Sequence, residues 1–342
     1  MTRASLRSAR RLAAVAALAL AAVVVPVAPA AACACGGVAP VSGSEVEVGR
    51  EHAIVSYRDG VEQIDLLLAM LSTGSEAGLV FPTPSPATVS LGELADFEEI
   101  DRETTPRRVE QQDWWTFRGL GDGGSSAGAP PEVLKRVRLG PIEAVTLAAD
   151  DAAGLEAWLA EHEFGLAPEV AALLDGYVDR GWFFVALKLT GDLPLDGDLD
   201  PLRFRFETDE LVYPLELSRA ATTPQTVRLH LFGDHRQRVA FVGGGEPVAI
   251  TSWAAPVASP ELARFGAYLT VVELWFAEPG TQIRGDLAIS DAPSDATTGT
   301  EYVVSVPVAV LGIPLGWLLL AFGAVVLVGL VAAGGIVGAK RS

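Results

Sequence analysis

Apolar and polar residues alternate along much of the second half of the chain. In the segments 202–207 and 227–231, every second residue is apolar and those between are mostly charged. A period of two is typical of strands with one buried face and one exposed face. The segments 211–217, 239–242, 268–276 and 283–289 also have the composition of strands. The C-terminal half is therefore predicted to be mainly β-structure.

Two apolar runs nearer the N-terminus, 52–57 and 61–70, are separated by Arg58, Asp59 and Gly60. An Asp-Gly pair supplies the positive φ angles that a tight hairpin turn needs. The pattern predicts a β-hairpin. Further strands are expected at 78–81, 133–139 and 142–147.

Helical periodicity appears in the middle of the chain. Ser90 and Glu93 have the spacing of a capping box, which predicts a short helix toward Ile100. An apolar face that ends at His162 predicts a second helix, capped by Asp150 or Asp151 and ended by Gly165. A third helix starts at Pro168, and its apolar face contains Val170, Leu173, Leu174, Tyr177 and Val178. The apolar segment 182–189 then predicts a central strand. The fold class is α+β: a β-rich domain with a helical pair in its middle.

Two apolar blocks at the ends predict export and anchoring. Residues 1–32 combine four arginines, an apolar stretch and Ala28-Pro29-Ala30, which indicates a cleaved signal peptide; an uncleaved membrane helix is the alternative. Residues 308–337 contain no charged residue, whereas roughly 20 apolar residues suffice to span a bilayer. Lys340 and Arg341 then predict a short cytoplasmic tail at 338–342. The expected product is a single-pass protein of the cell membrane, with an extracytoplasmic domain at 33–301.

The net charge is unevenly distributed. The whole chain has 25 basic and 43 acidic residues, for a net charge of −18. Six of the basic residues lie in the terminal blocks, which contain no acid, so residues 33–301 have 19 basic against 43 acidic residues and a net charge of −24. A domain this acidic lacks the basic footprint that nucleic-acid binding needs. The partners predicted are the membrane and an envelope protein or glycan. The spacing of Gly334 and Gly338 also allows dimerisation of the spanning helix.

The two cysteines, Cys33 and Cys35, directly follow the predicted cleavage site. Export places them in an oxidising compartment, which allows a strained Cys-Ala-Cys disulfide. A lipid on Cys33 is the second interpretation, although Ala30 stands where a lipobox usually has leucine. Intermolecular pairing and metal binding are further alternatives.

One acidic loop is a candidate calcium site. Asp196, Asp198 and Asp200 alternate, and Glu207 stands at the twelfth position counted from Asp196. An EF-hand loop needs glycine at its sixth position, where this chain has Pro201, so an EF-hand is excluded. A looser surface calcium site and a solvated acidic hairpin loop both stay open. No other cofactor is predicted.

No catalytic constellation is visible in the sequence. Ser126 lies in a Gly-x-Ser-x-Gly string, but this string falls in a Gly/Ser/Pro-rich segment, 119–131, that predicts a flexible loop without the strand and helix of a nucleophile elbow. His230 is expected to be solvated on the polar face of its strand and His162 to be a core residue. His52 and His235 are expected to stand alone. Two carboxylate pairs, Glu98-Glu99 and Asp150-Asp151, have ordinary helical explanations, and Trp114-Trp115 forms either core or a contact surface.

Several short motifs, in order, resemble the bacterial family catalogued as domain of unknown function 2330. They are Cys33-Ala34-Cys35-Gly36-Gly37, Tyr57-Arg58-Asp59-Gly60, Val80-Phe81-Pro82-Thr83-Pro84, Gly154-Leu155-Glu156-Ala157-Trp158-Leu159, Gly181-Trp182-Phe183-Phe184-Val185-Ala186 and Leu211-Val212-Tyr213-Pro214-Leu215. The resemblance implies an exported, often membrane-anchored protein without an assigned activity, and it supplies no catalytic residue. The composition, rich in alanine, glycine and arginine, suits an actinobacterial source.

Together these features predict a membrane-anchored extracytoplasmic protein that binds or scaffolds a component of the bacterial cell envelope. One alternative is an envelope hydrolase whose carboxylates and histidines meet only in the fold. The other is a calcium-dependent adhesion or sensor domain.

Overall fold

The computed structural model describes residues 37–40, 46–113, 136–137, 140, 143–148, 152–162, 165–310 and 313–339. Within these residues the protein is rich in strands and has few helices, which confirms the predicted β-rich character. Several predicted features lie outside the described residues: the signal peptide at 1–32, Cys33 and Cys35, Trp114 and Trp115, the loop 119–131 with Ser126, and Asp150 with Asp151.

The main sheet has nine strands. Its central path runs β15 (Ala249–Pro256), β16 (Tyr268–Phe276), β13 (Gln225–Gly233), β2 (Val46–Arg58), β3 (Val61–Ser72), β10 (Gly197–Leu199) and β7 (Arg136–Val137), and β11 (Leu202–Glu207) links β3 to β5 (Thr88–Leu91). Neighbouring strands are antiparallel except for β13 with β2 and β10 with β7. The β2–β3 hairpin turns at Asp59 and Gly60, whose φ angles of 54° and 80° confirm the predicted tight turn.

A second sheet of four strands packs against the inner face of the first. Its order is β1 (Gly37–Pro40), β4 (Glu76–Thr83), β9 (Phe183–Thr190) and β8 (Glu143–Ala148), all antiparallel. Phe81 of β4 stacks on Phe204 of β11, with 4.1 Å between ring centroids, in the core that the two sheets share. Burying a side chain of this size contributes roughly 1.5–3 kcal/mol. The alternation of apolar residues in both sheets therefore produces a sandwich.

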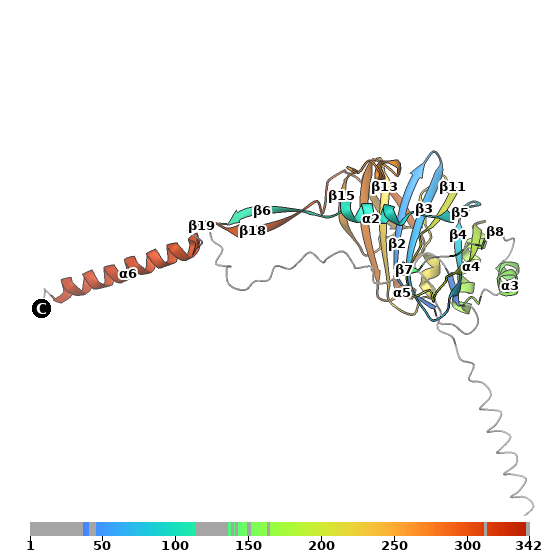
Figure 1. Ribbon diagram of the computed structural model, residues 1–342, viewed down its shortest axis with the longest axis horizontal. Helices are drawn as coiled ribbons and strands as arrows, with labels where there is room; N and C mark the ends of the chain where they lie inside the picture. The colour runs from blue at the N-terminus through green and yellow to red at the C-terminus, as the bar shows by residue number, and fades with distance from the viewer. Residues whose placement is uncertain are drawn as a thin grey trace, which may run out of the picture.

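Helices cover the outer faces of both sheets (Figure 1). The predicted helical pair forms α3 (Ala152–Glu161) and α4 (Pro168–Asp179), and it packs through Leu155, Val170, Leu174 and Tyr177 onto the four-stranded sheet. Strand β9 is thus covered on both faces, and it lies between β4 and β8, which confirms the predicted central strand. Helix α2 (Leu94–Glu103) instead lies across the outer face of the nine-stranded sheet.

The remaining elements are smaller. A three-stranded sheet joins β12 (Val212–Tyr213), β17 (Leu287–Asp291) and β14 (Gln237–Phe241), and the short helices are η1 (Glu216–Ala220), η2 (Leu262–Arg264) and α5 (Pro279–Gln282). Strands β6 (Arg107–Asp113) and β18 (Glu301–Pro307) pair in parallel as a ribbon that leads from the sandwich toward β19 (Ala309–Val310), β20 (Ile313–Pro314) and α6 (Leu315–Ala339) (Figure 1).

The structure does not support the membrane-spanning helix predicted at 308–337. No helix among the described residues combines the length and the hydropathy needed to cross a membrane.

Several local predictions were wrong. Ser90 does not cap α2, because it lies in β5 opposite Arg203, and the helix begins after Glu93 without a side-chain cap. The strand predicted at 211–217 is only two residues long, and a 3-10 helix from Glu216 to Ala220 takes up its end. Strands β6, β15 and β18 were not predicted. Strands β6 and β18 pair with each other and are remote in sequence, whereas β15 pairs with β16, the next strand along the chain.

Candidate functional site

Helix α2 packs on the outer face of the nine-stranded sheet. Its Phe97 and Ile100 pack onto Ile54, Phe232 and neighbouring apolar side chains on the outer face of the nine-stranded sheet. Residues on this face alternate along each strand with those of the shared core, since successive side chains of a strand point to opposite sides. By crossing the sheet, α2 separates polar side chains at one end of these strands from those at the other.

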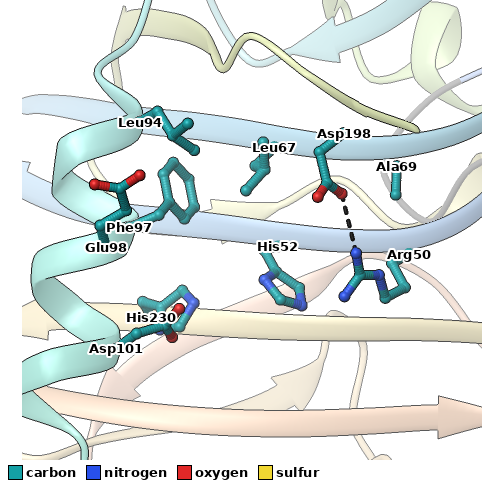
Figure 2. Close-up of a pocket in the computed structure, with 10 residues that line it drawn as sticks. All are labelled: Arg50, His52, Leu67, Ala69, Leu94, Phe97, Glu98, Asp101, Asp198 and His230. Atoms are coloured by element: carbon teal, nitrogen blue, oxygen red, sulfur yellow. Dashed lines mark hydrogen bonds and ion pairs between the residues drawn. The ribbon is translucent and has the colours of Figure 1, made fainter. Parts of the chain in front are cut away.

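A small cavity lies on one side of α2, where His52 of β2 and His230 of β13 meet. Their ring centroids are 6.0 Å apart, with an angle of 75° between the ring planes. Phe97 approaches His230 edge-on at 6.1 Å. The cavity has a volume of about 60 Å³, which suits water or a small polar group better than an extended substrate. Figure 2 shows both imidazoles beside α2, with Glu98 and Asp101 on the helix.

Both imidazoles are neutral at physiological pH. Burial, assisted by the guanidinium groups of Arg228 and Arg50, lowers the pKa of His52 to about 4. Burial also lowers the pKa of His230 well below its usual value, and its Nδ1 has no hydrogen-bond partner among the described residues. Burial raises the pKa of Asp101 at the same cavity. The cavity therefore holds two unprotonated imidazoles beside a carboxyl group whose pKa is raised.

The far wall of this cavity is an ion pair. Arg50 Nη2 lies 3.0 Å from Asp198 Oδ1, and Figure 2 marks this contact. The bond joins β2 to β10, two strands that are separated by β3 in the sheet. It holds the Asp198 carboxylate toward the cavity and balances its charge.

A much larger cleft lies at the opposite end of strands β2 and β13. Its volume is about 640 Å³, and its lining includes Tyr57, Arg58, Asp59, Asp234, His235 and Asp291. The hairpin turn between β2 and β3 supplies the first three, and the turn between β13 and β14 supplies Asp234 and His235. Pockets of roughly 300–1,000 Å³ are typical of small-molecule sites.

Two hydrogen bonds fix side chains at this cleft. The Tyr57 hydroxyl donates to the carbonyl oxygen of Thr208 at 3.0 Å, which holds the half-exposed ring in place. His235 Nδ1 lies 2.9 Å from the carboxylate of Asp295, and this bond raises the pKa of the imidazole. The cleft thus presents an ordered aromatic ring next to carboxylates.

The sequence model of the family described as "Uncharacterized protein conserved in bacteria (DUF2330)" matches residues 29–290. The chain belongs to this family. The matched range of the DUF2330 chain contains α2, both buried histidines and the cleft except for Asp291.

Other comparisons add little about the DUF2330 chain. No curated protein matches it. Among solved structures, it is similar to a crystal structure of baculovirus P35, with 8% sequence identity and a TM-score of 0.36; the match covers 75% of this chain and 98% of that one. A likeness at that TM-score carries no argument.

The structure corrects what the sequence indicated about the histidines of the DUF2330 chain. His230 is buried, not solvated, because α2 covers the face of β13 that was expected to meet water. His52 does not stand alone, since it faces His230, and His235 pairs with Asp295. His162 is exposed instead of buried, and its ring stacks on Trp158 at 3.8 Å.

The acidic residues singled out in the sequence lie in different environments. Asp198 is buried and paired with Arg50, whereas Asp196 and Asp200 lie in the flanking loop. Within the described part of the chain, no three His, Cys, Asp or Glu side chains are placed to hold a metal ion together. The looser calcium site stays a prediction. Glu99 forms an ion pair with Arg102, and Glu98 lies at the histidine cavity.

Sequence reasoning missed Arg50 and Asp101, which complete the histidine cavity. One signal was available for Arg50, because it has the same parity along β2 as His52 and therefore lies on the same face. No comparable signal marked Asp101, since its place at the cavity depends on where α2 crosses the sheet.

Proposed function

We propose that this protein is a tethered domain on the outside of a bacterial cell that binds an envelope component in the cleft beside the β2–β3 hairpin. The cleft of about 640 Å³ carries the proposal, because its volume lies within the range of ligand sites. The histidine cavity is roughly a tenth of that size and offers less room for a ligand.

The lining of the cleft favours a hydroxyl-rich ligand such as a glycan. Tyr57 is 36% exposed and offers an aromatic face, while Asp59 and Asp234 supply acceptors for hydroxyl donors. The ring is held by its bond to Thr208, so little conformational entropy is lost when a sugar packs against it. A protein partner is the alternative occupant of the same surface.

The tether in this proposal rests on the sequence. Residues 308–337 lack charge and the basic pair Lys340-Arg341 follows, while residues 1–32 have the pattern of an export signal. Fractionation of cells that express the full chain, compared with a chain ended at Thr300, tests it. The full chain should remain with carbonate-washed membranes and the shortened chain should not. Equal distribution of both forms contradicts the tether.

The binding test uses the full chain in detergent and a panel of cell-envelope saccharides, followed by calorimetry. Tyr57→Ala and Asp234→Asn should each lower the affinity for the bound saccharide by about tenfold. A loss of this size corresponds to one or two hydrogen bonds or ring contacts. Tyr302→Ala is the matched control, because Tyr302 is also exposed but lies on the β6–β18 ribbon. A panel without any binder, or equal loss in the control, contradicts the proposal.

A second candidate function is hydrolysis at the histidine cavity. The specific observation is that His52, His230 and Asp101, all with shifted pKa values, line one cavity. Imidazole and carboxyl groups at one cavity are the residue types of general acid–base catalysis, with His52 as a weak base because burial lowers its pKa. Turnover of ester or glycoside substrates that is lost in His52→Gln but kept in His162→Gln supports hydrolysis. No turnover in the parent chain contradicts it.

A further inference from the structure

A second pocket, lined by arginine, adjoins the cleft and shares Arg58 with it. Its volume is about 220 Å³, and its lining includes Arg58, Arg203, Arg205, Arg264, Ser56 and Gln63. Its full lining contains no acidic residue. This is unexpected in a chain with a net charge of −18, and it requires a structural explanation.

The sheet register brings these arginines together. Arg205 of β11 is opposite Gln63 of β3, which is in turn opposite Ser56 of β2. Arg203 and Arg58 lie two residues from members of this row, so their side chains point to the same face. Arg264 reaches the pocket from η2. Four guanidinium groups therefore converge from two strands, β2 and β11, and from the short helix η2.

Two of the four charges are already balanced. Arg203 donates to the buried carboxylate of Asp65 through Nε at 2.7 Å and Nη2 at 2.6 Å. Arg264 pairs with Asp96 of α2, and that carboxylate also lies 3.6 Å from Arg203. These bonds hold both guanidinium groups at the rim of the pocket.

The other two charges are not balanced. The guanidinium groups of Arg58 and Arg205 are exposed and make no ion pair or hydrogen bond with any residue that the structure describes. Their mutual repulsion, with Arg203 and Arg264 close by, is unfavourable unless an anion enters. The pocket thus has a surplus of two positive charges, and both guanidinium groups have donors available for an anion.

We infer that the arginine pocket binds a phosphate group. Guanidinium forks match phosphate oxygens in bidentate geometry, and a phosphate offers more acceptors and more charge than a carboxylate to bind the two unpaired guanidinium groups. The Ser56 hydroxyl and the Gln63 amide add neutral donors at the same pocket. This inference goes beyond the proposed function, because the pocket would bind phosphate whether or not the neighbouring cleft takes a glycan.

Calorimetry of the full chain with inorganic phosphate, at constant ionic strength, tests the inference. Arg205→Ala should weaken phosphate binding by about tenfold or more, since a charge-assisted hydrogen bond is lost. Arg205 lines the arginine pocket and not the cleft, and its side chain is unpaired, so the variant should unfold at the same temperature as the parent. Arg284→Ala, which removes an exposed arginine elsewhere, should leave phosphate binding unchanged.

Three results would overturn the phosphate site: no binding to the parent chain, equal binding by Arg205→Ala, or equal binding of acetate or uncharged trimethyl phosphate. Two further binding measurements then identify which kind of molecule supplies the phosphate group. Glycerol phosphate probes a soluble polymer unit, and short-chain phosphatidylglycerol probes a lipid headgroup. Binding in either arm that depends on Arg205 supports the site. Tyr57→Ala should leave inorganic phosphate binding intact, which keeps the outcome distinct from that of the cleft.

Discussion

Arg203 holds the carboxylate of Asp65 with two hydrogen bonds, and the same guanidinium lies 3.6 Å from Asp96 in the first turn of α2. Asp65 is fully buried and Asp96 nearly so. Burial raises the pKa of Asp65, while the bond to Arg203 opposes that rise. Because Arg203 contacts both Asp65 of β3 and Asp96 of α2, it fastens α2 to the sheet. This contact lies between the histidine cavity and the arginine pocket.

Breaking this pair on one side should be costly. Arg203→Met leaves an unpaired buried carboxylate, and we expect the free energy of unfolding to fall by about 3–5 kcal/mol. The double change Arg203→Met with Asp65→Leu removes both charges and should recover much of that loss. Urea denaturation of the full chain in detergent measures both.

The matched control is Arg228→Met. Arg228 pairs with Glu273 at 2.6 Å, but both side chains are partly exposed, so its loss should cost less than about 1 kcal/mol. Equal losses in Arg203→Met and Arg228→Met would contradict the fastening role of the buried pair.

Asp286 is predicted to be a structural centre, although in the sequence it belongs to an unremarkable Arg-Gly-Asp tripeptide. Its Oδ1 accepts hydrogen bonds from the backbone N–H groups of Leu215 and Glu216, at 2.8 and 2.9 Å, and the Tyr177 hydroxyl donates to the same carboxylate. Arg180 completes the group at 3.2 Å. Asp286→Ala leaves several buried hydrogen-bond donors without an acceptor, so the free energy of unfolding should fall by about 3 kcal/mol or more.

Tyr177→Phe removes a single donor from this centre and should cost about 1–2 kcal/mol. Asp209→Ala serves as the control, because Asp209 is exposed and should change stability by no more than about 0.5 kcal/mol. Chemical denaturation at neutral pH ranks the three variants. An order other than Asp286→Ala, Tyr177→Phe, Asp209→Ala would refute the assignment.

Local chemistry made part of the fold predictable. The turn at Asp59 and Gly60 follows from backbone sterics alone, and both residues have the expected positive φ. The apolar face of α4 was also correct at Val170, Leu174 and Tyr177, because a period of 3.6 needs no knowledge of the partner surface. In both cases, the physical cause lies within a few residues.

The candidate sites could not be predicted in the same way. Alternation along β13 correctly divides its two faces, but whether the face with His230 meets water depends on α2, which comes from a distant part of the sequence. Similarly, Arg205 looks like an ordinary outward residue until β3 and η2 bring Arg264 and Gln63 beside it. Tertiary contact, and not local pattern, decides these environments.

A glycine at the cleft provides a test of close packing. A Cβ atom on Gly266 would lie 2.8 Å from the backbone nitrogen of Gly233, and both residues line the cleft. Because backbone atoms yield little, Gly266→Ala should destabilise the fold by about 1–3 kcal/mol and weaken ligand binding in the cleft.

Gly176→Ala is the opposite case. Gly176 lies inside α4, and a Cβ there would contact nothing within 4 Å. Alanine favours a helix interior over glycine by about 0.5–1 kcal/mol, so this variant should be more stable than the parent. Thermal unfolding of the two variants should therefore shift in opposite directions, and a shared direction would rule out the steric argument.

The buried histidines should make stability fall in mild acid. The pKa of His52 is about 4 in the folded chain against 6.5 for an ordinary histidine, and that of His230 is lowered as well. Between these pH values the unfolded chain binds protons that the folded chain refuses, so unfolding free energy rises with pH and drops on acidification. Between pH 7.5 and 5.5 we expect the two histidines to remove about 1–3 kcal/mol.

Other groups act in the opposite sense over the same range. Burial raises the pKa of Asp65, Asp101 and Asp286, which favours the folded state as the pH falls. The informative quantity is therefore the difference between the parent and His52→Gln, measured by urea denaturation across this pH range. The parent should lose about 1 kcal/mol more than the variant, while His162→Gln, at an exposed site, should follow the parent. Parallel pH profiles for the parent and His52→Gln would show that the imidazole stays as basic in the fold as in water.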